Sequence, residues 1–126
     1  MAPGMWRPFF LTDTVVVAAS STGVATFTTP TNEEFEADSL LIVATSNAFN
    51  IETMQDESGQ GYTNADSANP LTGTMFPIAQ TNLRQPLALP APLQIRPNGT
   101  FNVTLRDTSG SENTIRIMFI GKRRTV

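Results

Sequence analysis

The side chains with the most obvious chemical potential in this 126-residue sequence are carboxylates. The densest acidic group comprises Glu33, Glu34, Glu36 and Asp38. Two carboxylates across a cleft can hydrolyse a glycosidic bond, but a chain of this length without large insertions offers little cleft between them. We therefore interpret the group as a solvated, charged surface and expect the protein not to be an enzyme.

The composition excludes most other catalytic chemistry. The chain has no His and no Cys. It therefore lacks the usual general base at neutral pH, the Ser-His-Asp and Cys-His nucleophile systems, and the commonest ligands of zinc, haem and iron–sulfur clusters. Lys122 is the only lysine, and its surroundings do not match a phosphate-binding loop. We expect no catalytic residue and no cofactor.

One oxygen-rich turn is a candidate for a metal. Asp56-Glu57-Ser58-Gly59, with Asp66 downstream, has the oxygen ligands and the glycine that a calcium loop uses. Its spacing does not match the helix–loop–helix pattern of calcium-binding proteins. We predict an ordinary polar loop without a metal, and cation binding by residues 55–73 stays an open alternative.

Charge is distributed unevenly along the chain, whose formal net charge is −3. Residues 1–83 contain one basic and nine acidic residues, whereas residues 84–126 contain seven basic and two acidic ones. If the strands of the two halves do not interleave, the fold would have an acidic and a basic patch, which would help copies of the protein or a partner dock in one orientation. If the strands interleave, the surface charge is mixed. The basic end Lys122-Arg123-Arg124 is too short for a nucleic-acid stripe. We expect it to face solvent or an acidic protein.

The elements that must position these residues are short strands separated by turns. Alternation of apolar and polar residues in 100–106 and 115–120 is typical of half-buried strands, which a polar turn would join into a closing hairpin. Further strand-like runs are 14–19, 24–28, 39–45 and 49–54. Asn98-Gly99 is a strong turn signal. Seven or eight such strands predict an all-β fold, an antiparallel two-sheet sandwich of the jelly-roll type.

Several segments depart from simple alternation. Residues 33–38 allow a single helical turn, whereas 39–45 are almost wholly apolar and are expected to be covered on both faces. Residues 55–73 lack periodicity and indicate an exposed loop. Residues 74–78 suggest a short edge strand, because Pro77 cannot join a central ladder. The proline-rich stretch 86–97 is expected to be an edge strand or a polyproline-like connector.

Residues 1–11 are predicted to form an extended N-terminal arm, and residues 12–126 a single domain. The aromatic and apolar side chains of the arm would dock on this domain or on a neighbouring subunit. Because prolines interrupt the arm, we expect no secretory signal, and we expect no bilayer span because the longest apolar run, 40–44, is too short. Met118 and Ile120 fall on the strand face expected to be wet, so we predict that something covers that face.

The spacing of the closing segment resembles that of a known group of proteins. It reads Pro92-x-x-Ile95-x-x-x-Gly99-x-Phe101-x-Val103-x-Leu105, then Ile115-x-Ile117-x-Phe119-x-Gly121-Lys122. This pattern resembles small β-sandwich structural proteins of tailed bacteriophages, and among them the jelly-roll decoration, or cement, proteins of capsids. The resemblance covers about residues 35–122. It implies a non-enzymatic protein of the virion, made in the host cytoplasm and placed on the capsid surface.

The partner implied by this resemblance is the major capsid protein, with no nucleic acid and no membrane. The protein would bridge neighbouring capsid subunits and form a homo-dimer or homo-trimer. The predicted capsid contacts are Met5, Trp6, Phe9, Phe10, Leu87, Leu89, Lys122, Arg123 and Arg124, and the predicted self-association residues are Met118 and Ile120. The alternatives are a head-fibre or tail component, or a receptor- or carbohydrate-binding module. Against the last, Trp6 lies in the arm and Tyr62 is alone in a polar loop, so no aromatic platform is evident.

Overall fold

The computed structural model describes residues 4–66, 68–75 and 86–126. Its strands are β1 (Arg7–Val17), β2 (Thr22–Thr28), β3 (Glu33–Ala44), β4 (Phe49–Asp56), β5 (Leu71–Thr72), β6 (Leu87–Ile95), β7 (Thr100–Asp107) and β8 (Asn113–Thr125). One short 3₁₀ turn, η1 (Gly73–Met75), follows β5. Among the described residues no helix is long and apolar enough to cross a membrane.

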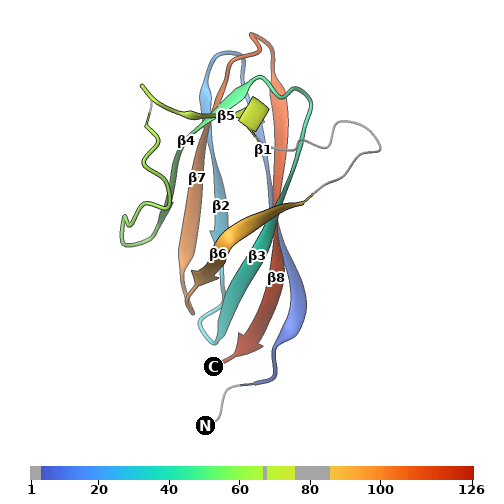
Figure 1. Ribbon diagram of the computed structural model, residues 1–126, viewed down its shortest axis with the longest axis vertical. Helices are drawn as coiled ribbons and strands as arrows, with labels where there is room; N and C mark the ends of the chain where they lie inside the picture. Colours follow the sequence, from blue (N-terminus) through green and yellow to red (C-terminus); the bar gives the residue numbers. More distant parts are fainter. Residues whose placement is uncertain (1–3, 67, 76–85) are drawn as a thin grey trace.

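The strands form two antiparallel sheets that pack face to face, in the orders β1-β8-β3-β6 and β2-β7-β4-β5 (Figure 1). The pairs β1/β8, β2/β7, β3/β6 and β4/β5 are all hydrogen-bonded, as they would be in one long hairpin rolled up on itself. This is the jelly-roll arrangement. The predicted all-β, two-sheet sandwich is confirmed.

The core lies between the sheets because every second side chain of the strands points inward. Phe27 and Phe101 both pack edge-on against Phe119, with ring centroids 4.9 and 5.8 Å away. Such edge-to-face contacts add to the stability that burial of the rings supplies. The six inward residues expected in the closing segment are all buried: Phe101, Val103, Leu105, Ile115, Ile117 and Phe119.

The closing strands do not pair with each other, which corrects the expected hairpin. β7 lies in one sheet and β8 in the other, so the chain crosses between sheets at residues 108–112. Alternation is the same in a hairpin and in two facing strands, and therefore cannot separate the two cases. Asp107 organises the crossing: its carboxylate accepts hydrogen bonds from the Ser20 and Gly110 amides and from the amide and hydroxyl of Ser109.

Two expectations for the middle of the chain are also wrong. Residues 33–38 form no helical turn; they are the first half of β3, with a register shift between Ala37 and Ser39. The apolar run that follows is not covered on both faces, because Leu41 is only half-buried and Val43 is exposed. A strand whose solvent-facing residues are also apolar thus has the same sequence pattern as a strand that is buried on both faces.

The edges of the sheets resolve the remaining segments. Residues 7–11 are not part of an arm but the first half of β1, an edge strand paired with β8. Pro8 and the adjacent Phe9 and Phe10 hid the alternation. The proline-rich stretch forms β6, the opposite edge of the same sheet. Thr74 and Met75 belong to η1, and the rest of the predicted strand 74–78 lies outside the described residues.

Candidate functional site

The outer face of the β2-β7-β4-β5 sheet is polar. Strand alternation and register place on it a field of threonine, asparagine and glutamine side chains: Thr22, Thr26, Thr28, Asn50, Thr53, Gln55, Asn102 and Thr104. Val24 interrupts this field and is 51% exposed. Such a face is what a solvated antiparallel sheet is expected to show.

The outer face of the β1-β8-β3-β6 sheet differs. Phe10 lies opposite Ile120, and Met118 lies opposite Leu41. Val16 and Val43 lie further along the same face, where Arg116 lies between Thr14 and Val43, and Thr114 lies opposite Val16. Phe10 is 59% and Val16 58% exposed, and Val43 is also exposed. We call these residues the apolar face: Phe10, Val16, Leu41, Val43, Met118 and Ile120. Exposed apolar patches on one side of a soluble protein mark contact sites.

Two of these six residues were expected from the sequence, namely Met118 and Ile120, and both do point outward while remaining half-buried by their neighbours. Phe10 was assigned to the arm, and Leu41 and Val43 to a doubly covered strand. The pairing of β1 and β3 with β8 brings the six residues onto one face. This pairing joins segments that are far apart in the chain, so no single stretch of sequence shows it. Whether they mediate self-association stays a prediction.

The basic end of the chain is used largely within the molecule. Arg123 stacks on Phe9, 4.2 Å from the ring centroid, and pairs with Glu33 at 3.0 Å. Arg124 lies 4.4 Å from the ring centroid of Trp6 and forms an ion pair with Glu34.

Lys122 is exposed at 5.0 Å from the Trp6 ring. Phe9 and Trp6 are half-buried against the domain, whereas Met5 is 84% exposed. Leu87 and Leu89 are half-buried and pack against the core from the edge strand β6. Most of the side chains predicted to contact the capsid thus already contact other residues of this chain.

The uneven charge of the sequence does not become two separate patches. β8 lies between β1 and β3, and β7 between β2 and β4, so strands of the two halves interleave. Each of the four ion pairs in the described part of the chain joins an arginine after residue 84 to a glutamate before residue 83: Arg96–Glu57, Arg106–Glu52, Arg123–Glu33 and Arg124–Glu34. The mixed surface is the outcome of folding.

The acidic residues of 33–38 each have a partner within the chain. Glu33 and Glu34 are held by arginines, Glu36 accepts a long hydrogen bond of 3.5 Å from Gln94, and Asp38 is exposed and accepts a bond from the hydroxyl of Ser39. These carboxylates are distributed along β3 rather than across a cleft. The four carboxylates form ion pairs and hydrogen bonds with neighbouring side chains, as charged residues on the surface of a strand usually do.

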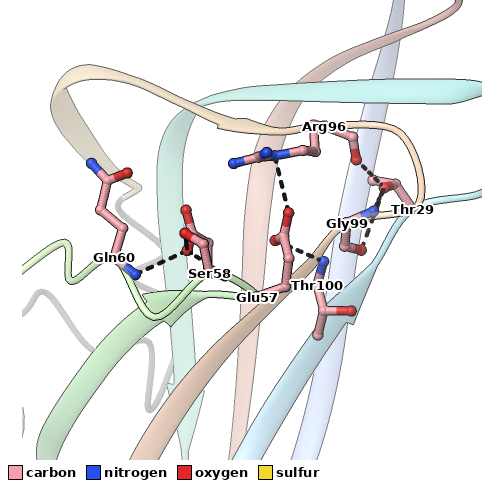
Figure 2. A network of polar contacts seen from close by, with 8 residues as sticks. Thr29, Glu57, Ser58, Gln60, Arg96, Gly99 and Thr100 are labelled. Carbon is pink, nitrogen blue, oxygen red and sulfur yellow. Dashed lines mark hydrogen bonds and ion pairs between the residues drawn. The ribbon is translucent and has the colours of Figure 1, made fainter.

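Three loops meet at the end of the sandwich where β6 gives way to β7 (Figure 2). The turn Arg96–Gly99 closes with a 2.9 Å bond from the Gly99 amide to the Arg96 carbonyl, and Asn98 adopts a φ of 55°. The Thr29 hydroxyl donates to the Arg96 carbonyl at 2.6 Å. Glu57 pairs with Arg96 and accepts from the Thr100 amide. The loops after β2, β4 and β6 are therefore tied together.

The first part of the polar segment 55–73 is an ordered turn. One oxygen of Asp56 accepts bonds from the Ser58 amide and hydroxyl and from the Gln60 amide. The Ser58 hydroxyl is the main cause that lowers the pKa of Asp56. Asp66 likewise accepts bonds from the Ala68 and Asn69 amides. Among the described residues no group of acidic side chains is arranged to hold a metal ion.

This turn places Tyr62. The Tyr62 amide donates to the Met54 carbonyl at 2.7 Å, and the ring packs edge-on against Phe101 with centroids 5.1 Å apart. Burial, with the neighbouring charges of Asp56 and Glu57, raises the pKa of the phenol. Even so, Tyr62 is 43% exposed.

A cavity of about 310 Å³ opens at this end of the sandwich. Trp6 and Tyr62 both line it, together with polar side chains of β6 and of the loops. The two aromatic residues are therefore not isolated from each other, as the sequence suggested. Their separation of 56 positions along the chain gave no signal of this. A second, apolar groove of about 390 Å³ is lined by Leu87, Leu89 and Met54 among others.

Comparison with known proteins gives no assignment. No family model matches the chain, and no curated protein matches it significantly. A β-porphyranase of glycoside hydrolase family 86 from the human gut bacterium Bacteroides plebeius aligns with a TM-score of 0.34 and 12% identity, over 91% of this chain and 20% of that one. An arabinose-bound α-L-arabinofuranosidase aligns with a TM-score of 0.34 and 15% identity, over 98% and 25%. The chain thus spans a quarter or less of these enzymes, and so distant a similarity carries no argument about function.

Proposed function

We propose that this protein is a non-enzymatic structural component of a tailed-bacteriophage virion that binds the outside of the capsid and bridges neighbouring subunits. The observation that supports the proposal is the apolar face on the β1-β8-β3-β6 sheet. The opposite outer face of the same sandwich is polar. The apolar character is therefore a property of one face and not of the whole surface.

Binding through the apolar face should cost little conformational entropy. Its six side chains come from three adjacent, hydrogen-bonded strands, so the backbone is already fixed before contact. Binding then loses mainly side-chain freedom. Apolar area removed from water contributes about 25 cal/mol per Å². When several copies engage several subunits, modest contacts are multiplied by effective concentration.

The proposal divides the contact between two occupants. The centre of the apolar face, with Met118 and Ile120, serves self-association as a dimer or trimer. The end of the same face, where Met5, Trp6 and Lys122 remain accessible, contacts the major capsid protein. Arg123 and Arg124 hold Glu33 and Glu34, so their role in the contact is to position the aromatic rings beside them.

The test is binding of the purified protein to capsid shells that lack it, measured by co-sedimentation, together with the resistance of the shells to heat and chelation. The variant Phe10→Ser/Met118→Thr/Ile120→Thr removes the centre of the apolar face while keeping residues that tolerate strands. We expect apparent affinity for shells to fall at least tenfold, about 1.4 kcal/mol, because a protein that cannot self-associate loses the multivalent contact with several subunits.

The matched control is Val24→Thr, an equally exposed apolar residue on the polar outer face, which should bind as the unchanged protein does. A strictly monomeric protein that leaves shells unaltered in their resistance would refute the proposal. Equal loss of binding in the control would show that the apolar face is not the contact.

A further inference from the structure

The cavity at the loop end is independent of the apolar face and has the features of a ligand site. Its volume of about 310 Å³ lies at the small end of the range for small-molecule pockets. Its walls come from the segment before β1, the start of β3, the end of β4 with the turn that follows it, the edge strand β6 with the turn after it, and the start of β7. The hydrogen bonds among Thr29, Arg96, Gly99 and Glu57 fix two of these loops in place. A ligand would therefore meet a site that is already formed.

The apolar part of the cavity wall is aromatic. Tyr62 presents part of its ring to solvent while Phe101 supports it from the core side. Trp6 lines the same cavity, backed by the Arg124 and Lys122 cations over its ring. Both residues combine an apolar ring with a polar atom that can form a hydrogen bond.

Polar groups with unused hydrogen-bonding capacity surround these rings. The side-chain amide of Gln60 has no partner among the described residues, and Gln94 has only the 3.5 Å bond to Glu36. Arg96 uses its Nε atom on Glu57, and 65% of its side chain is exposed. Figure 2 shows Gln60 and Arg96 on separate loops, with the Arg96 side chain above Glu57 and Gln60 beyond Ser58. The cavity wall thus offers both donors and acceptors.

The composition of the wall restricts the chemical class of the ligand. The cavity is lined by the carboxylates of Glu34, Asp56 and Glu57 and by one arginine, which disfavours an anion. The carboxylates already bond arginines or backbone amides, which leaves no arrangement for a metal ion among the described residues. A neutral ring with many hydroxyl groups and an apolar face satisfies both the mixed donors and acceptors and the aromatic walls.

We propose that this cavity binds a neutral saccharide, with a pyranose ring against Tyr62 and its hydroxyls bonded by Gln60, Gln94 and Arg96. The site needs no covalent step and no cofactor. The cavity shares Trp6 with the proposed capsid contact, but Gln60, Tyr62, Gln94 and Arg96 lie outside that contact, so variants at these positions test saccharide binding without changing it.

The experiment is a titration of the labelled full-length protein followed by NMR, with glucose, galactose, mannose, N-acetylglucosamine and their disaccharides as probes. We expect at least one probe to bind with a dissociation constant in the millimolar range or below, and to shift the signals of Gln60, Tyr62 and Arg96. Tyr62→Ala should weaken binding at least tenfold. Tyr62→Phe keeps the ring and should retain most of the affinity, which guards against loss through misfolding.

Gln60→Ala should weaken binding several-fold, because it removes a hydrogen bond to the saccharide. The Gln60 side-chain amide has no partner among the described residues, so the substitution should leave the fold unchanged. The matched control Gln55→Ala removes an exposed amide on the polar outer face and should change nothing. Two results would overturn the proposal: no probe binds at millimolar concentration, or a probe binds equally well to the Tyr62→Ala and Gln60→Ala variants.

Discussion

At the scale of single residues, the fold depends on a few buried polar side chains that hold distant loops together. Asp107 is 2% exposed and bonds Ser20, which is 87 positions away. Asn113 is fully buried; its amide accepts from the Ser46 amide and donates to the Ser46 carbonyl, both at 3.1 Å. The sequence indicates turns at both places, because such residues favour turns. Their partners are set by the packing of the two sheets and are not visible in local sequence.

Asp107 makes stability depend on pH in the acid range. The Ser109 hydroxyl, followed by the Ser20 amide, lowers its pKa from 3.8 to about 2 in the folded chain. A carboxyl with a lowered folded-state pKa stabilises the fold above its ordinary pKa, and the contribution is lost as the pH falls through the folded-state value. Thermal unfolding should therefore show a loss of stability between pH 4 and pH 2. Asp107→Asn should be less stable at pH 7 and should lose this part of the pH dependence, whereas Asp38→Asn, at an exposed position, should not.

Asn113→Ala should lower the free energy of unfolding by about 1–3 kcal/mol, because it leaves the Ser46 amide and carbonyl without their buried partner. Chemical denaturation measures this. Asn64→Ala, at an exposed loop position, is the control and should lie within about 0.5 kcal/mol of the unchanged protein. Equal stability of the two variants would contradict the role assigned to Asn113.

At the scale of elements, alternation in the sequence predicts most strands, whereas sheet membership comes from contacts that alternation does not encode. The closing pair is the clearest case: 100–106 and 115–120 read correctly as strands but lie in opposite sheets. Residues 7–11 fail differently, because Pro8 and neighbouring aromatic residues mask an edge strand that tolerates proline on its free side. Asp13 marks that edge in the structure: its carboxylate caps the Thr26 amide of β2 at 2.8 Å and closes this side of the sandwich.

Gly121 is required where β8 passes the register shift of β3. A Cβ atom at this position would lie 1.9 Å from the Glu36 carbonyl oxygen and 2.7 Å from the Ala37 Cα. Both are backbone atoms and cannot move aside cheaply. Gly121→Ala should therefore reduce the free energy of unfolding by about 3 kcal/mol, the upper range for overpacking.

Gly110→Ala is the comparison for this prediction. Gly110 has a φ of 78° and nothing near its Cβ position, so the substitution should cost only the backbone strain of about 1–2 kcal/mol. Denaturant titration measures the free energy of unfolding of both variants, and so compares the cost of a steric clash at residue 121 with the cost of backbone strain at residue 110. A smaller loss for Gly121→Ala than for Gly110→Ala would contradict the close approach of β8 and β3.

At the scale of the whole molecule, the sandwich has two unlike outer faces and, at its loop end, the cavity that Trp6 and Tyr62 line. The sequence predicted the jelly roll and identified Met118 and Ile120 as outward apolar residues. It missed the rest of the apolar face and the shared cavity of Trp6 and Tyr62, because both depend on register between strands far apart in the chain. The sequence left two alternatives open for the uneven charge, and the structure has the mixed surface, because pairing of β8 with β3 joins Arg123 to Glu33.

The molecular account predicts a concentration-dependent mass in solution. The protein should associate to a dimer or trimer in analytical ultracentrifugation, and the Phe10→Ser/Met118→Thr/Ile120→Thr variant should remain a monomer with an unchanged circular dichroism spectrum. Association driven by apolar burial should persist at high salt, because ionic screening weakens charge contacts far more than apolar ones. A monomer at all concentrations would remove self-association from the account.

The proposed place on a capsid is tested most directly by a density map of phage shells that lack this protein and have been incubated with it. The account predicts the sandwich on the outside of the capsid shell, with the β1-β8-β3-β6 face turned toward neighbouring copies and capsid subunits and the β2-β7-β4-β5 face toward solvent. A map in which the chain is absent from the shell, or in which Phe10, Met118 and Ile120 face solvent, would contradict it.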